Sequence, residues 1–235
     1  MLEISATTEW QRSHPRAIIG LLEISGIANA HPSPELNQRK RETELRLRGR
    51  FKGYSRTDFL SLPVIMAYHQ YYKRFGKTYH VLLQLESIVL KGKTLPSVSP
   101  AVDASFLAEV DTLVLTAAHD VPNLDEPVSI DVARGADFIT QMKGECKTIP
   151  VGDMIMRDAK GVCCSIIYGQ DDRSPVSPGT TRVLYVAYAP AGIPADLVDA
   201  QLKAIEGNIR LFSHSAKVEQ RRLLSRTNLR RPTTH

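Results

Sequence analysis

Cysteine is scarce in this chain of 235 residues, which contains only Cys146, Cys163 and Cys164. Because this count is odd and the spacing is irregular, the sequence does not indicate a disulfide framework, and a reducing cytoplasm is the expected compartment. No run of about 18 apolar residues occurs, so we expect no transmembrane helix. The first residues, MLEISATTEWQRSHPR, contain no basic stretch followed by an apolar core, so we expect no secretory signal.

The motifs of common nucleotide-binding and hydrolytic sites are missing too. GxGxxG, GxSxG and HExxH do not occur, and no set of Cys and His residues has the spacing of a zinc site. The GKT triplets at 76–78 and 92–94 lack the upstream glycine of a phosphate-binding loop, and helix ends explain them better. Cys163 and Cys164 are adjacent in a predicted strand, so they point to opposite faces and cannot hold one metal. We therefore expect neither a metal nor a cofactor.

The net charge of +5 is unevenly distributed along the chain. Residues 213–235 contain six basic residues and one acidic residue, so they carry the whole excess of positive charge. We expect one compact domain over residues 1–212, then a basic tail over 213–235 that is flexible or forms a loosely docked helix. Such a tail can contact nucleic-acid phosphates or an acidic membrane surface, or it can be a solvated end. The candidate RNA-binding residues are Arg221, Arg222, Arg226, Arg230 and Arg231.

Helical patterns fill the first half of the chain and strand patterns most of the second. Helices are predicted at 33–51, 62–76, 82–92, 99–115 and 194–212. Strands are predicted at 2–5, 17–27, 127–133, 137–140, 149–156, 161–169 and 182–190. Because the two kinds of element are segregated and do not alternate, the predicted fold class is α+β.

The stretch LPSVSPAVDASFLAEVDTLVLTAAHDV, residues 95–121, is apolar yet contains several polar groups. Ser99 is suited to cap a buried helix, and Asp103 in the first turn is the usual partner of the helix dipole. His119 and Asp120 admit two interpretations. They are one half of a general acid–base pair, or they are a polar exit from the helix.

The segment DDRSPVSPGTT, residues 171–181, is a polar loop between two predicted core strands. Asp171 and Arg173 at the mouth of a sheet would suit a pocket for an amino acid or for the end of a nucleotide. The same residues also suit a plain surface loop.

Several segments occur in the order found in one family. They are FLSLPVIMAYHQYYKRFG, LLQLESIVLKGKTLPSVSPAVDASF, AAHDVPNLDEPVSIDVARGADF and GDMIMRDAKGVCCSIIYGQDDR. Together they resemble the stand-alone relatives of the B3/B4 domain of the phenylalanyl-tRNA synthetase beta subunit. The resemblance covers residues 15–212, and SVSPAVD and GDMIMRD are its most specific parts. It implies an α+β fold with helices packed on a barrel-like β core.

The resemblance also implies a site. In the synthetase this domain hydrolyses tyrosine that is wrongly attached to the phenylalanine tRNA. Ser105 matches a hydroxyl residue of the family's pocket, and Asp103 matches the aspartate of its VD pair. The strand end at Ile166 matches the main-chain wall of that pocket, and Tyr168 and Gly169 follow it as substrate-binding candidates.

Two positions depart from the family. Its editing histidine aligns with Ala117, two residues before His119, and its glutamate aligns near 185–187, where no acidic residue stands. Because a site that loses a polar partner loses discrimination, tyrosine-specific editing is not implied. A changed aminoacyl substrate, or binding without hydrolysis, remains open.

The first hypothesis is therefore an editing-like domain that recognises aminoacyl-tRNA or its aminoacyl-adenosine end and hydrolyses mischarged tRNA in trans. The catalytic candidates are Ser105 and His119, with Asp103 and Asp120 as further substrate-binding residues and Asp171 and Arg173 at the rim. The second hypothesis is a non-catalytic module that binds RNA or an amino-acid-like ligand. An unrelated small-molecule enzyme on the same fold is a third.

Overall fold

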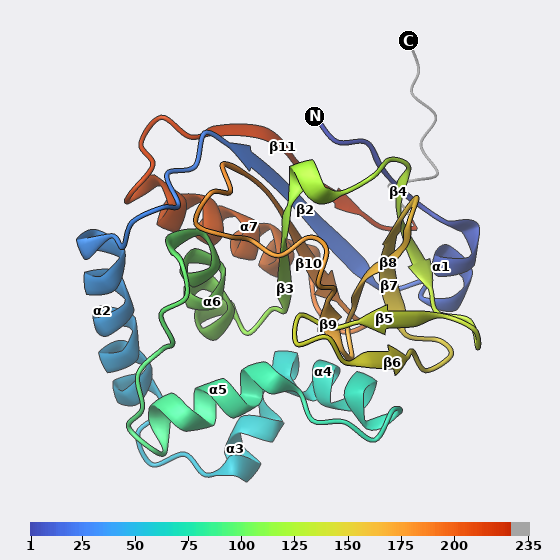
Figure 1. Cartoon of the computed structure of the whole chain (residues 1–235). Coiled ribbons are helices and arrows are strands. Elements are labelled where there is room, and N and C mark those ends of the chain that lie inside the picture. Colours follow the sequence, from blue (N-terminus) through green and yellow to red (C-terminus); the bar gives the residue numbers. More distant parts are fainter. Residues whose placement is uncertain (227–235) are drawn as a thin grey trace.

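The computed structural model describes residues 1–226, which form an α+β fold of seven α-helices and three sheets (Figure 1). The helices are α1 (Thr8–Ser13), α2 (Pro34–Arg50), α3 (Arg56–Ser61), α4 (Pro63–Lys73), α5 (His80–Val89), α6 (Pro100–Thr112) and α7 (Ala195–Arg210). The strands are β1 (Ile4–Ala6), β2 (Ile18–Ser25), β3 (Thr116–Asp120), β4 (Val128–Val132), β5 (Phe138–Thr140), β6 (Cys146–Thr148), β7 (Met154–Asp158), β8 (Gly161–Ser165), β9 (Gly169–Gln170), β10 (Arg182–Ala189) and β11 (Lys217–Leu224). A short 3-10 helix, Val121–Asn123, follows β3. The predicted α+β class is confirmed.

The main helices begin where local signals place them. The side chain of Ser33 accepts a hydrogen bond from the Leu36 amide, and Pro34 is the first residue of α2. Pro100 likewise opens α6, but the side chain of Ser99 makes no capping hydrogen bond, so the expected cap is not formed. The sequence did not predict the short helix α3, which precedes α4. A reciprocal pair of hydrogen bonds between Ser55 and Asp58 caps its start.

The strands form separate sheets, and the expected barrel-like core is not what the structure contains. The larger sheet has the order β1-β4-β7-β8-β9, the second has the order β11-β2-β10-β3, and β5 and β6 form a hairpin. Each of the two larger sheets ends in two different edge strands, so neither closes on itself. Within residues 1–226 there is thus no closed barrel.

The four-stranded sheet lies between two helices and the five-stranded sheet. Helices α6 and α7 lie on one side of it, and the five-stranded sheet with α1 lies on the other (Figure 1). Gly20 of β2 allows α7 to approach closely, since a Cβ there would lie 2.8 Å from Val198 Cγ1. In the part of the chain that the structure describes, no helix is long and apolar enough to cross a membrane.

The segment around His119 corrects one prediction. Helix α6 ends because Leu113 adopts a left-handed conformation with φ 65°, and the chain then enters β3. His119 and Asp120 are therefore strand residues, paired with Leu184 and Val183 of β10, and they are not the polar exit of a helix.

The basic C-terminal segment corrects another prediction. Residues 217–224 form β11, which pairs antiparallel with β2 and places Leu224 in the core at 3% exposure. This segment is ordered because it covers a strand that would otherwise be an edge of the sheet. The expected flexible tail from residue 213 is thus wrong for residues 217–224.

Candidate functional site

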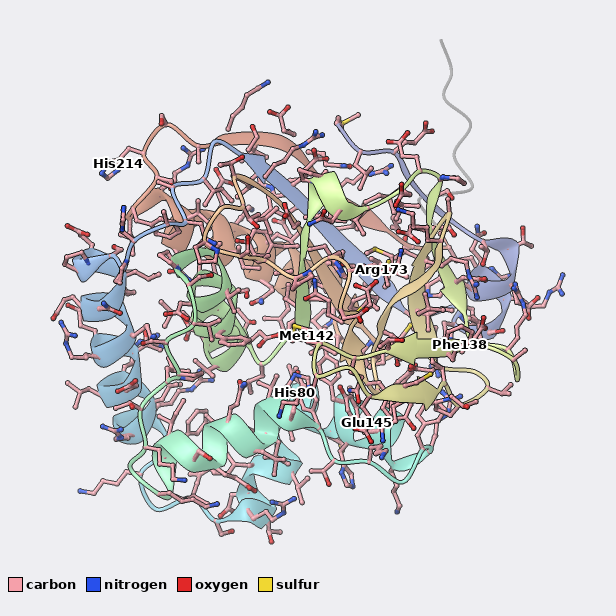
Figure 2. The ribbon with its side chains drawn as sticks, viewed as in Figure 1. His80, Phe138, Met142, Glu145, Arg173 and His214 are labelled. Carbon is pink, nitrogen blue, oxygen red and sulfur yellow. The ribbon has the colours of Figure 1, made fainter. Side chains whose placement is uncertain are left out.

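A cavity of about 360 Å³ opens between α5, α6, β3 and the turn that joins β8 to β9. Met142, at the tip of the β5–β6 hairpin, and His80, at the start of α5, both line it and lie in the middle of Figure 2. Most other lining side chains are apolar, as shown by Val102, Phe106 and Ile166. An apolar concavity with a few polar groups is the usual form of a small-ligand site.

Helix α6 supplies one wall, and Ser105 lies in it as the sequence predicts. Its side chain is buried, and its hydroxyl donates to the Val102 carbonyl over 2.8 Å. This is a local helix contact that leaves the oxygen able to accept a further hydrogen bond. No hydrogen bond joins Ser105 to an imidazole or carboxylate of residues 1–226, so its hydroxyl is not activated as a nucleophile.

Asp103 does not line this cavity but fixes its rim. Its carboxylate forms an ion pair with Lys40 at 2.8 Å and accepts a hydrogen bond of 2.9 Å from the Val98 amide. Lys40 in turn donates to the Pro96 carbonyl and to the Ser97 hydroxyl. Because Val98 lines the cavity, the buried pair positions the loop at its entrance.

The wall opposite α6 is the turn after β8, which contains the predicted residues Ile166 and Gly169. Asp153 holds this turn, since its carboxylate accepts hydrogen bonds from the Ser165 hydroxyl and the Ile167 amide. The Tyr71 hydroxyl donates to the same carboxylate over 2.7 Å. Burial raises the pKa of Asp153 to about 6, although these hydrogen bonds oppose the rise.

Tyr168 lies beyond the wall and outside the cavity lining. Its carbonyl accepts a hydrogen bond of 2.7 Å from the Gln141 side chain, which ties the β5–β6 hairpin to the turn. Its ring lies below the Lys77 ammonium, 5.4 Å from the centroid. This attachment places Met142 at the cavity mouth, where 63% of it remains exposed.

Strand β3 presents main-chain groups to the cavity because it is the edge of its sheet. The Thr116 amide donates to Glu109 and the Asp120 amide donates to the Ser174 carbonyl, both away from β10. Main-chain direction alternates along a strand, so the N–H and C=O of Ala118, midway between them, also point away from β10. Ala118 lines the cavity. The bridge between His119 and Pro175 pairs the Ala118 carbonyl with the Val176 amide, so the N–H is the group that Ala118 offers at the edge.

His119 lies in the protein interior and does not line the cavity. Its Nδ1 lies 2.8 Å from the Ser174 hydroxyl, which donates to Asp171 over 2.7 Å, and 3.3 Å from the side-chain nitrogen of Gln170. Its Nε2 is buried without a partner among residues 1–226. Burial lowers the pKa of His119 to about 3, so the ring is neutral at physiological pH.

The predicted rim residues Asp171 and Arg173 form a structural clasp. Arg173 pairs with Asp171 at 2.8 Å and with Asp158 at 3.1 Å. Asp171 is 1% exposed, so it is unavailable at a rim. Asp120 is likewise occupied, since it accepts a hydrogen bond of 2.9 Å from Asn123. None of these side chains lines the cavity.

The candidate RNA-binding arginines fall into three groups. Arg221 pairs with Asp199 and Glu206 of α7, and Arg222 donates to the Ile4 carbonyl. Arg226 is exposed. Arg230 and Arg231 lie outside the described residues. RNA binding by this set stays a prediction.

The side chains that could bind a metal ion are not clustered in the part of the chain that the structure describes. Within residues 1–226, no group of three or more His, Cys, Asp or Glu side chains is arranged to bind a metal ion. The adjacent cysteines of β8 are both buried, and burial raises the pKa of Cys164 to about 12. The thiol of Cys164, which lines the cavity, therefore stays protonated.

Comparison with known proteins gives matches among solved structures. One of the similar solved structures is an N-terminal fragment of the phenylalanyl-tRNA synthetase beta-subunit from Pyrococcus horikoshii, with 9% sequence identity and a TM-score of 0.46. The chain is structurally similar to this fragment. The match covers 93% of this chain and 52% of the fragment, so the chain spans about half of that length. No family model and no curated protein matches the sequence. This fragment comes from the subunit that the sequence resembles, and no function follows from similarity at this level.

Most residues that line the cavity were not found by sequence reasoning, and Met142, Gln84 and Tyr188 are three examples. Gln84 lies in a predicted helix, Tyr188 lies in a predicted strand, and Met142 lies between two predicted strands. No local signal separates these from their neighbours, because only the packing of distant elements brings them to one cavity. The register of β10 on β3 could have pointed to Tyr188, whose amide donates to the Leu115 carbonyl.

Proposed function

We propose that the cavity binds the aminoacyl end of an aminoacyl-tRNA, with the amino-acid side chain inside and the ester end at the mouth. The observation that carries this proposal is an apolar cavity of about 360 Å³ bordered by the edge of β3. Apolar walls suit an amino-acid side chain. The N–H of Ala118 suits the ester carbonyl, in the way that sheet edges bind peptides.

A second hollow supports an extended ligand. It has a volume of about 390 Å³ and shares His80 and Gln84 with the cavity, so the two spaces adjoin. Leu83 and Lys93 also line it. Leu83 is 43% exposed and gives an apolar face for a base, and the ammonium of Lys93 suits a phosphate. The terminal adenosine of a tRNA would occupy this hollow.

The cavity favours binding over strong acid–base catalysis. Ser105 has no base beside it, the thiol of Cys164 is protonated, and His119 is turned into the protein interior. Hydrolysis of a bound ester would therefore depend on a water positioned by main-chain groups such as the N–H of Ala118.

A second candidate is an amino-acid-like small ligand bound without RNA. The ion pairs of Arg221 with Asp199 and Glu206 favour it, because they occupy a guanidinium that RNA binding would need. The two candidates differ in whether the adenosine and the phosphates contribute to affinity.

The deciding experiment measures binding of non-hydrolysable aminoacyl-adenosine amides, alongside deacylation of a panel of correctly and wrongly charged tRNAs. We expect saturable binding, and a loss of about tenfold or more in the Ala117→Phe variant, because Ala117 lines the cavity and the larger side chain takes up space in it. Ala200→Phe, on the exposed face of α7, is the matched control and should bind as the unaltered protein does.

The outcomes separate the candidates. Loss of one mischarged tRNA, with correct pairs spared, would identify hydrolysis and name the substrate. Binding of aminoacyl amides that is unaffected by adenosine would support the small-ligand candidate. If no aminoacyl compound binds the folded protein, the proposed function is wrong.

A further inference from the structure

A second concave site lies apart from the cavity, between the turn that follows α1, the end of α4 and the loop that follows β10. It has a volume of about 260 Å³ and shares no lining residue with the cavity. Its basic lining residues are His14, Arg16 and Arg74, and no aspartate or glutamate lines it. We call it the basic hollow, because it gathers positive charge and supplies no counter-charge of its own.

Arg74 is held in this hollow without an acidic partner. Its guanidinium lies over the rings of Tyr71 and Phe75, 5.4 and 5.2 Å from their centroids. It forms no ion pair or hydrogen bond within residues 1–226, whereas Arg12 of α1 pairs with Glu9. Stacking fixes the side chain but leaves the N–H donors at the edge of the guanidinium without a protein acceptor.

Gly152 brings His14 and Arg74 together. The Gly152 carbonyl accepts a hydrogen bond of 3.1 Å from His14 Nε2, and a Cβ at this glycine would lie 3.5 Å from Arg74 Nη2. Burial of the imidazole and then the charge of Arg74 lower the pKa of His14, so the two side chains lie close enough to repel each other when both are charged. An anion in the hollow would relieve this repulsion.

Arg16 adds a second guanidinium without an acidic partner. It lies in the turn between α1 and β2, it is exposed, and its side chain forms no ion pair or hydrogen bond within residues 1–226. The side-chain amide of Gln70, from α4, also lines the hollow. The donors therefore come from two segments that are far apart in the chain.

The size and the donors of the basic hollow restrict its ligand. Its volume is below the roughly 300–1,000 Å³ of sites for drug-sized ligands, so a small group fits it better. Guanidinium groups bind carboxylates and phosphates through paired N–H donors. A terminal phosphate offers several oxygens around one atom, whereas a carboxylate offers two in one plane. Donors from separate segments therefore suit a phosphate better.

We propose that the basic hollow is a binding site for a phosphate group, with Arg16 and Arg74 donating hydrogen bonds to its oxygens. This inference concerns a site separate from the cavity and does not rest on the proposed function. The phosphate group belongs to a small phosphomonoester, such as a nucleoside monophosphate, or to the backbone of a nucleic-acid strand. The experiment separates these two sources.

The test follows amide chemical shifts of the full-length protein during titrations at constant ionic strength. The probes are inorganic phosphate, adenosine monophosphate and an oligonucleotide without terminal phosphates. We expect saturable shifts at residues 14–17 and 70–75 with inorganic phosphate. Arg16→Gln and Arg74→Gln should each weaken its binding about tenfold, because each removes charge-assisted hydrogen bonds. Both arginines are exposed, so the variants should fold, and thermal unfolding checks that they do.

Lys73→Gln is the matched control. Lys73 precedes Arg74 in α4, is exposed and does not line the hollow, so the variant removes the same charge one residue away. It should bind phosphate as the unaltered protein does. An equal weakening in Lys73→Gln and Arg74→Gln would indicate general attraction between charges and would overturn the inference.

The outcomes also identify the source of the phosphate group. Saturation by the monophosphate and not by the oligonucleotide would identify a phosphomonoester, and the reverse would identify a nucleic-acid strand. Saturation by inorganic phosphate alone would identify the free anion. If no probe gives saturable shifts in the basic hollow, the inference is wrong, and the proposed function of the cavity is unaffected.

Discussion

Lys40 of α2 and Asp103 of α6 form a buried ion pair, with 2.8 Å between Nζ and Oδ2 and side chains only 6% and 7% exposed. Lys40 also donates to the Pro96 carbonyl, and Asp103 accepts from the Val98 amide. The pair therefore joins two helices and the loop at the cavity rim. Asp103, which the sequence analysis assigned to substrate binding, instead positions the loop at the cavity rim.

Lys40→Met should lower the free energy of unfolding by about 3–5 kcal/mol, because it leaves a buried carboxylate without its partner. Adding Asp103→Leu should restore much of that loss, since the double variant buries no charge. Urea denaturation of Lys40→Met, of Asp103→Leu and of the double variant measures both effects. Additive losses in the double variant would show that the two side chains are not coupled.

Glu109 makes stability depend on pH. Burial raises its pKa to about 8, although the hydrogen bond from the Thr116 amide opposes the rise. The folded protein therefore holds a proton that the unfolded chain releases near pH 4.5, so stability is lost as pH rises from about 4.5 to 8. Between pH 5 and 7 we expect a decrease of roughly 2–3 kcal/mol from this group.

Glu109→Gln should remove that part of the decrease, because the amide keeps an acceptor for Thr116 but does not titrate. Urea denaturation at several pH values measures it. Asp153 is the internal comparison, since its pKa of about 6 produces a decrease that ends at lower pH. A Glu109→Gln profile that parallels the unaltered protein would contradict the assignment.

His119 is predicted to matter for stability and not for ligand binding. His119→Ala should lower the free energy of unfolding by about 2–4 kcal/mol, because it leaves a cavity and removes the partner of Ser174. Affinity for an aminoacyl-adenosine amide should stay within about twofold, since His119 does not line the cavity. Ser105→Ala, which alters the lining itself, is the companion variant. A loss of hydrolysis in His119→Ala with unchanged melting would restore the histidine as a catalytic candidate.

The basic C-terminal segment needs two truncations to separate folding from RNA binding. Removing residues 213–235 should destabilise the protein strongly, because it deletes β11 and uncovers β2. Removing only residues 227–235 retains the strand but deletes Arg230 and Arg231. The RNA hypothesis predicts that this shorter truncation reduces the slope of log affinity against log salt by about 2. An unchanged slope would exclude these two arginines as phosphate contacts.

Part of the candidate site was accessible from sequence. Ser105, Ile166 and Gly169, which the family resemblance singled out, line the cavity, and their role in substrate binding stays a prediction. The other substrate-binding candidates do not line it. Asp171 and Asp103 carry the residue type expected of a site, but their charges are neutralised inside the protein by Arg173 and Lys40. The residue type alone does not show which basic side chain will pair with a carboxylate in the folded protein.

By itself, the sequence determined the α+β class and where the principal helices begin. Those features depend on neighbours a few residues apart, such as Ser33 and Pro34 at the start of α2. Only the tertiary structure decided that the basic segment forms β11, that His119 is a strand residue and that Tyr188 reaches the cavity floor. Each of those outcomes depends on pairing between strands far apart in the chain, and the burial that selects one pairing exists only once the sheets have formed.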